Sequence, residues 1–176
     1  MTKKQEMEQF DSGSLGELVP GEILEQYAPM IGELILTFSE LEHTLNGEVV
    51  KMICARADTV GYAVIGGLRY GQKIELFKNL FGPTVHSLNN KELEKVFDDL
   101  VSRLVCTSEY RNNVAHAEWC NLDADSHVRV KIKSDKLGTM SVFKKITMEV
   151  LEEQIEEIKS LSEDLYDFYD RVMQPV

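Results

Sequence analysis

The sequence predicts an all-α protein, a four-helix bundle with a small β-hairpin between the third and fourth helices. Over four segments, apolar residues recur at three- and four-residue steps, which is the spacing of one buried helix face. Between the last two segments the apolar spacing changes to every second residue, as in a half-buried strand. Helices of this length pack most simply as a bundle.

The chain has 176 residues, enough for one domain with a sizeable core. Residues 1–19 lack periodicity and are expected to form a flexible leader, whereas residues 20–176 are expected to form a single helical domain. No long apolar stretch is present and the N-terminus lacks the apolar core of a secretory signal, so no membrane segment is expected. Three widely spaced cysteines indicate reduced thiols, and therefore a cytoplasmic location.

The first two helices are predicted from their apolar stripes. The first long helix has a stripe from Tyr27 to Met52, and Pro29 is tolerated only near its start or as a kink. Residues 58–69 hold three glycines and are expected to form a loop or a short broken helix. Residues 70–81 are predicted to form a shorter helix, which Gly82–Pro83 should end.

The second half of the chain is predicted to form two helices with the hairpin between them. The third helix should start near Asn90 and run to about Trp119, with an inward stripe that includes Val114 and Ala115. The hairpin is placed at about 122–146, with a strand at 128–133, a turn at 134–138 and a return strand at 140–146. Thr147 is a suitable N-cap for the last helix.

Charge is distributed unevenly. The formal net charge is −11, which argues against a protein that coats nucleic acid along its whole surface. Residues 120–146 carry six basic and three acidic residues, a local charge of +3. An anionic ligand is expected to approach this region. The alternative is that its lysines and arginines only protect a sheet edge from pairing with other chains.

Two patterns that suggest other chemistry are incomplete. Residues 61–67 have the glycine spacing of a phosphate-binding loop, but Gly67 and Leu68 occupy the places of the required Lys and Ser/Thr. His116 and Cys120 are one helical turn apart, but no third ligand is nearby in the sequence. We therefore expect no metal and no cofactor.

Arg111 lies on the inward stripe of the third helix. A guanidinium that faces the inside of a bundle cannot stay unpaired, because burial of a lone charge is very costly. It must meet a carboxylate, a second protomer or an anionic ligand. Glu42 is a candidate carboxylate, because it flanks inward residues of the first long helix. The alternative is that Arg111 and the asparagines after it form only a salt bridge and a helix cap.

Asn112 and His116 are four residues apart and share a helix face, so the amide could orient the imidazole. Arg111 and His116 are five residues apart, which is roughly 140° around a helix axis. They lie on adjoining flanks and can border one cleft. A cleft between two copies of the helix, with one Arg and one His from each copy, would bring both groups to one phosphate.

Arg111, the asparagine directly after it, and His116 resemble the signature of the HEPN superfamily, in the form Arg-Asn-x-x-Ala-His. The helical arrangement resembles the family over about residues 21–174, with the hairpin as an elaboration. The resemblance implies a homodimer with both motif helices at a shared cleft. Many members are metal-independent endoribonucleases of toxin–antitoxin, phage-defence and RNA-processing systems.

Carried over by position, the resemblance assigns a role to each motif residue. Arg111 would stabilise charge on the attacked phosphate, His116 would transfer protons between the ribose 2′-hydroxyl and the leaving oxygen, and Asn112 would hold the histidine or a phosphate oxygen. Glu42 and Ser108 are expected to support the site. RNA contacts are assigned, on weaker grounds, to basic residues of two segments, namely Arg69, Lys73, Arg129, Lys131 and Lys133.

The sequence thus predicts a dimeric endoribonuclease that cleaves RNA by 2′-hydroxyl attack, with an antitoxin or another protein as a further partner. The alternative is a noncatalytic HEPN-like helical module that binds a protein partner or a nucleotide, in which Arg111 would form a structural ion pair with Glu42. The −11 charge weakens the case for RNA, because RNA affinity normally comes from phosphate contacts.

Overall fold

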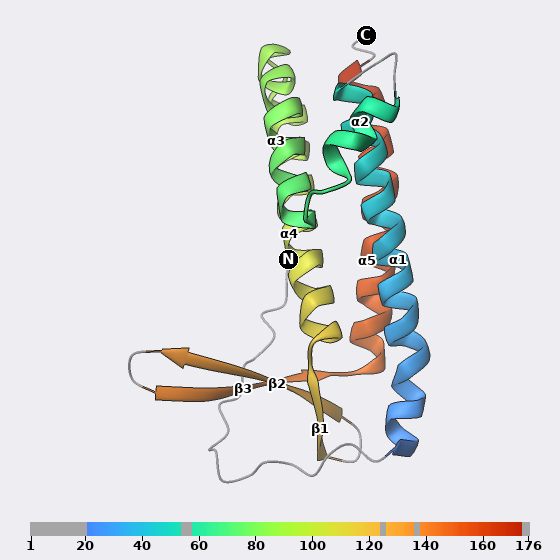
Figure 1. The fold of residues 1–176 in the computed structure, drawn as a ribbon, viewed down its shortest axis with the longest axis vertical. Helices are drawn as coiled ribbons and strands as arrows, with labels where there is room; N and C mark the ends of the chain where they lie inside the picture. Colours follow the sequence, from blue (N-terminus) through green and yellow to red (C-terminus); the bar gives the residue numbers. More distant parts are fainter. Residues whose placement is uncertain (1–20, 54–57, 124–125, 136–137, 174–176) are drawn as a thin grey trace. The chain divides into compact units, whose positions relative to one another are not determined.

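The computed structural model describes residues 21–53, 58–123, 126–135 and 138–173 (Figure 1). Helices dominate these residues, in agreement with the predicted class. The leader predicted over residues 1–19 lies outside them. In chain order the elements are α1 (Gly21–Ile53), α2 (Asp58–Ile65), α3 (Tyr70–Ser87), α4 (Lys91–Ala115), β1 (Glu118–Asp123), β2 (Ser126–Asp135), β3 (Gly138–Ile146) and α5 (Met148–Met173).

The chain groups into two compact units. The helical unit comprises Leu34–Arg111 and Gln154–Val176, and so holds most of α1, α4 and α5 together with α2 and α3. The sheet unit comprises Met1–Glu33 and Asn112–Glu153, and so holds the first part of α1, the last residues of α4, the three strands and the start of α5. The boundary between Arg111 and Asn112 divides the predicted motif.

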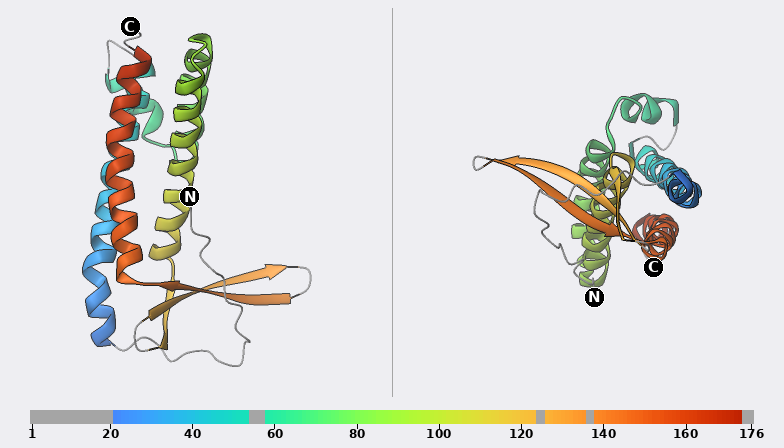
Figure 2. Two further views of the ribbon diagram at one scale, coloured as in Figure 1. Left: turned by 180° about the vertical axis from the view of Figure 1, so that it is seen from behind. Right: turned by 90° about the horizontal axis from the view of Figure 1, so that it is seen from below.

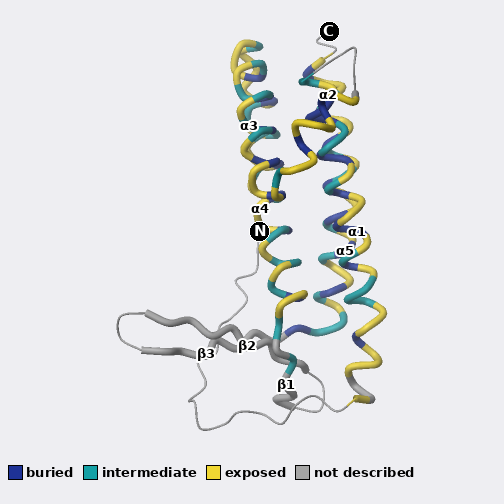
Figure 3. The backbone as a smooth tube through the Cα atoms, in the orientation of Figure 1, coloured by how far each residue is buried: buried dark blue, intermediate teal, exposed yellow. Residues whose placement is uncertain are grey.

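The helical unit is a helical bundle with an aromatic core. Phe77 and Phe81 of α3 meet Phe97 of α4 and Phe168 of α5, with ring centroids between 4.6 and 6.0 Å apart. Buried positions recur along one side of each long helix (Figure 3). Full burial of such a side chain stabilises by about 1.5–3 kcal/mol, so this cluster is a main source of the unit's stability.

The predicted stripe of α1 is buried over most of its length. In the helical unit Leu34, Phe38, Leu41, Leu45 and Val49 are all buried, as their three- and four-residue spacing indicates. Asp58–Ile65 forms the short helix α2, one of the two structures expected for this glycine-rich segment.

The prediction that Gly82–Pro83 ends the helix expected over residues 70–81 is wrong, because α3 continues to Ser87. Phe81 and Val85 are both buried and lie one turn apart on the face that packs inward. A proline inside a helix costs about 3 kcal/mol, and burial of this face offsets that cost. Leu88 is the C-cap of α3, and the next residue, Asn89, has a φ of 50°, a conformation common just after helix ends.

Helix α4 begins as predicted but ends earlier. The Asn90 side-chain oxygen accepts hydrogen bonds from the backbone N–H groups of Glu92 and Leu93, at 3.1 and 3.2 Å. The helix ends at Ala115, not near Trp119, and Ala115 is exposed rather than inward. Trp119 lies in β1, and its ring packs on Tyr27 with centroids 5.8 Å apart.

The sheet unit contains one strand more than the expected hairpin. The order is β1-β2-β3 and both pairings are antiparallel, with Glu118 opposite Val130 and Asp135 opposite Gly138 (Figure 2). The Thr147 hydroxyl then accepts a hydrogen bond from the backbone N–H of Val150 at 3.4 Å, as expected of the N-cap of α5.

Candidate functional site

The candidate site in the helical unit is centred on Arg111, near the end of α4. Its guanidinium carbon lies 4.3 Å from the centre of the Phe38 ring of α1. This distance is typical of a cation–π contact, in which the negative face of the ring attracts the cation. Arg111 is half-buried, and its Nε atom is buried without a hydrogen-bond partner among the described residues. The predicted inward position is therefore correct, and the aromatic ring takes the place of the expected carboxylate.

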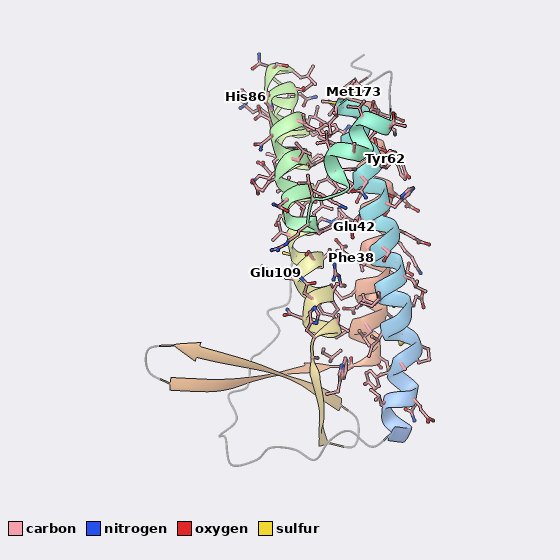
Figure 4. All side chains as sticks on the ribbon, in the orientation of Figure 1. Phe38, Glu42, Tyr62, His86, Glu109 and Met173 are labelled. Atoms are coloured by element: carbon pink, nitrogen blue, oxygen red, sulfur yellow. The ribbon has the colours of Figure 1, made fainter. Side chains whose placement is uncertain are left out.

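Glu42 does not pair with Arg111. Its Oε1 atom instead accepts a hydrogen bond of 2.7 Å from the ammonium group of Lys73, on α3. Among the described residues no carboxylate forms an ion pair with Arg111. Figure 4 labels Phe38 and Glu42 on α1, one helical turn apart. The guanidinium therefore keeps its positive charge without an acidic partner in this part of the chain.

Tyr70, the first residue of α3, completes the cluster. Its ring centroid is 4.7 Å from that of Phe38, and its hydroxyl is buried without a hydrogen-bond partner among the described residues. Burial raises the pKa of Tyr70 far above its ordinary value, Glu42 raises it further, and Arg111 acts in the opposite direction. The hydroxyl therefore lies within the electrostatic range of both charged groups.

We call Phe38, Glu42, Tyr70, Lys73 and Arg111 the arginine cluster. Three helices supply it: α1 gives Phe38 and Glu42, α3 gives Tyr70 and Lys73, and α4 gives Arg111. The sequence contained a signal for part of it, because Phe38 and Glu42 are four residues apart. Nothing in the sequence pointed to Tyr70, since no pattern links the start of α3 to Arg111.

Asn112 and His116 belong to the sheet unit, and both side chains are exposed. The backbone N–H of His116 donates to the carbonyl of Asn112 at 3.1 Å, directly after the last residue of α4. The histidine is therefore held by the last helical turn, with its imidazole open to solvent. An exposed imidazole at a helix end is able to exchange protons with a ligand or with water.

The remaining predicted residues differ in accessibility. Ser108 is half-buried on α4 and Arg69 is exposed just before α3. Lys73 is only 7% exposed and ion-paired, so its ammonium is occupied by Glu42. Arg129, Lys131 and Lys133 occupy alternate backbone positions of β2, and their side chains lie outside the described part.

Two further features concern the described residues alone. These residues contain no group of three or more His, Cys, Asp or Glu side chains placed to hold a metal ion. No helix among them has both the length and the apolar character needed to cross a bilayer.

A scan against protein-family models found no match, and searches of curated proteins and of solved structures gave no significant match. The resemblance to the HEPN superfamily therefore remains a prediction that depends on residues 111–116.

Proposed function

We propose that this protein is a homodimeric, metal-independent endoribonuclease of the HEPN type that acts in a toxin–antitoxin or phage-defence setting. The observation that carries the proposal is the state of Arg111. Its guanidinium rests on the Phe38 ring and has no carboxylate partner among the described residues. An arginine held in this way has a net positive charge to offer, and guanidinium groups bind phosphate oxygens through paired N–H donors.

The proposed reaction uses the ribose of the substrate as nucleophile. His116 removes the proton of the 2′-hydroxyl, the 2′-oxygen attacks the adjacent phosphorus, and the bond from phosphorus to the 5′-oxygen breaks. The protonated His116 gives its proton to the leaving 5′-oxygen, so the products are a 2′,3′-cyclic phosphate and a 5′-hydroxyl. Arg111 stabilises the charge that develops on the phosphate, and Asn112 orients His116 or a phosphate oxygen. Acid–base help of this kind accelerates a reaction about 10²–10⁴-fold.

We expect a dimer to gather the two groups at one phosphate, with each copy supplying Arg111 from α4 and His116 from the residue directly after α4. Val105 is an exposed apolar residue of α4, the helix that we expect to meet its copy in the dimer. Val105→Glu should therefore convert the dimer to a monomer in light scattering. The matched control is Leu36→Glu, at an exposed leucine of α1, which should leave the dimer intact.

The test of activity is an incubation of single-stranded RNA with purified protein in excess EDTA. We expect cleavage with 2′,3′-cyclic phosphate ends, and loss of cleavage in His116→Ala and Arg111→Met. His86→Ala is the matched control, because His86 is an exposed histidine of α3. Cleavage that continues unchanged in His116→Ala would refute the proposal.

The competing hypothesis is a noncatalytic helical module that binds a protein partner or a nucleotide. It assigned Arg111 to a structural ion pair with Glu42, and Glu42 binds Lys73 instead. Protein that is folded and dimeric, yet cuts no RNA of any sequence, would favour this reading over the nuclease.

A further inference from the structure

The arginine cluster contains two cations and one carboxylate, an arrangement that allows two alternative ion pairs. Lys73 takes the carboxylate of Glu42 at 2.7 Å, which leaves Arg111 on the Phe38 ring. In the alternative arrangement Glu42 would pair with Arg111 and leave Lys73 buried and alone. In the observed pairing, the charges of Lys73 and Glu42 cancel each other. The net positive charge of the cluster therefore lies on Arg111, which is half-buried.

Glu42 shares a face of α1 with the ring that supports Arg111. It lies one turn from Phe38 on α1, and Phe38 is the residue that supports the guanidinium. Both Glu42 and Arg111 act electrostatically on the hydroxyl of Tyr70. An arginine that has no acidic partner among the described residues attracts nearby carboxylates.

We propose that Lys73 is a positioning residue that keeps Glu42 away from Arg111 and so leaves the guanidinium free for a phosphate group of the substrate. This inference rests on the nuclease function proposed above. It replaces the RNA contact predicted for Lys73 with a role inside the fold. A nearly buried lysine is costly unless it is paired, so the Lys73–Glu42 bond is held firmly in place.

The proposal predicts an unusual mutational pattern. Lys73→Met should release Glu42, which then captures Arg111, and kcat for RNA cleavage should fall about 10²-fold, as on loss of one charge-stabilising donor. Glu42→Gln should lose less of the rate than Lys73→Met, because Arg111 stays free. The double variant Glu42→Gln/Lys73→Met should regain most of the rate that Lys73→Met loses.

The matched control is Lys78→Met on the same helix. Lys78 pairs with Glu75 at 2.9 Å, but both are exposed and neither belongs to the cluster, so kcat should not change. A merely structural role for Lys73 predicts a different result, in which Glu42→Gln and the double variant are as impaired as Lys73→Met. That result, or an unchanged kcat in Lys73→Met, would overturn the proposal.

An NMR measurement separates this inference from the nuclease function. The Nε–Hε signal of Arg111 is assigned by its loss in Arg111→Met. In Lys73→Met this signal should shift and its hydrogen exchange should slow, and both effects should disappear in the double variant. An unshifted signal in Lys73→Met would overturn the inference even if the wild type cuts RNA. A shifted signal would support it even if no RNA is cut.

Folding of each variant is checked by circular dichroism before either assay. If Lys73→Met does not fold, Lys73→Gln takes its place, because its amide can still donate a hydrogen bond to Glu42 but carries no charge. The same shift and the same rescue by Glu42→Gln are then expected, with a smaller loss of rate. The absence of both would count against the proposal.

Discussion

The contact between Arg111 and Phe38 gives a prediction that does not depend on catalysis. The guanidinium carbon is 4.3 Å from the ring centre, within the distance of about 6 Å over which cation–π attraction acts. Because Arg111 is half-buried, we expect an attraction of about 1–2 kcal/mol. A double-mutant cycle with Phe38→Leu and Arg111→Met measures this value.

The two single variants should lower the free energy of unfolding by different amounts. Phe38→Leu loses the cation–π contact and also the ring contact with Tyr70, which contributes about 0.5–1.5 kcal/mol. We therefore expect a total loss of about 1.5–3.5 kcal/mol in the free energy of unfolding. Arg111→Met loses the same attraction but removes a buried Nε that has no partner, so its net effect should stay below about 1 kcal/mol.

The assay is urea unfolding at pH 7, with the free energy of unfolding obtained by linear extrapolation. Far-UV circular dichroism follows all the helices, while the fluorescence of the one tryptophan, Trp119, reports on the sheet unit. Coincident transitions from the two probes justify a two-state treatment.

Phe168→Leu, combined with Arg111→Met, is the matched control. The Phe168 ring contacts Phe77, Phe81 and Phe97 in the same unit, so this pair should be additive to within roughly 0.5 kcal/mol. A coupling energy between Phe38 and Arg111 no larger than that of the control pair would show that the ring does not hold the guanidinium, and the description of the cluster would fail.

Three further predictions concern the fold and its pH dependence. Arg103 donates hydrogen bonds of 2.6 Å to two carboxylates of α5, so Arg103→Met should lower the free energy of unfolding by about 1.5–3 kcal/mol. Lys78→Met, which removes an exposed ion pair, should change it by no more than about 1 kcal/mol, and urea unfolding of both variants measures the difference. A methyl group at Gly61 would lie 2.6 Å from Cγ1 of Val50, so Gly61→Ala should lower the free energy of unfolding by about 1–3 kcal/mol. The loss should be smaller when Val50 is also replaced by alanine. Equal losses with and without Val50→Ala would contradict the clash. Because the pKa of Tyr70 is raised, its phenol stays neutral in the folded protein at a pH, near 10, at which it ionises in the unfolded chain. The free energy of unfolding should therefore fall as the pH rises above about 10. Unfolding measurements between about pH 8 and 11 should show a smaller fall in Tyr70→Phe.

The spacing of apolar residues predicted the helices well where a helix buries one face and exposes the other. The stripe on α1 from Leu34 to Val49 is buried as expected, and apolar residues at helical spacing from Leu151 to Val172 are buried on α5 as well. Capping chemistry also acts locally, and Thr147 was recognised as an N-cap for this reason; the structure shows the same chemistry at Asn90, near which a helix start was predicted. These features depend on residues within a few positions of one another.

The errors in the predicted elements occur where distant contacts outweigh local preference. Gly82–Pro83 is a strong local signal for a helix end, yet Phe81 and Val85 bury on one face and α3 continues through it. Strand β1 was missed because its six residues gain their structure from pairing with β2, which is a partner that no local pattern announces.

For the candidate site, the sequence by itself determined the chemistry that is present: an arginine on an inward stripe, an asparagine directly after it, and a histidine one helical turn beyond the asparagine. Only the tertiary structure decided which charges meet. Glu42 was the natural acidic partner of Arg111, but the fold gives Glu42 to Lys73 and gives Arg111 the ring of Phe38. Residues on three separate helices make that choice, and side-chain pairing between helices depends on distances and burial that exist only once the helices have packed.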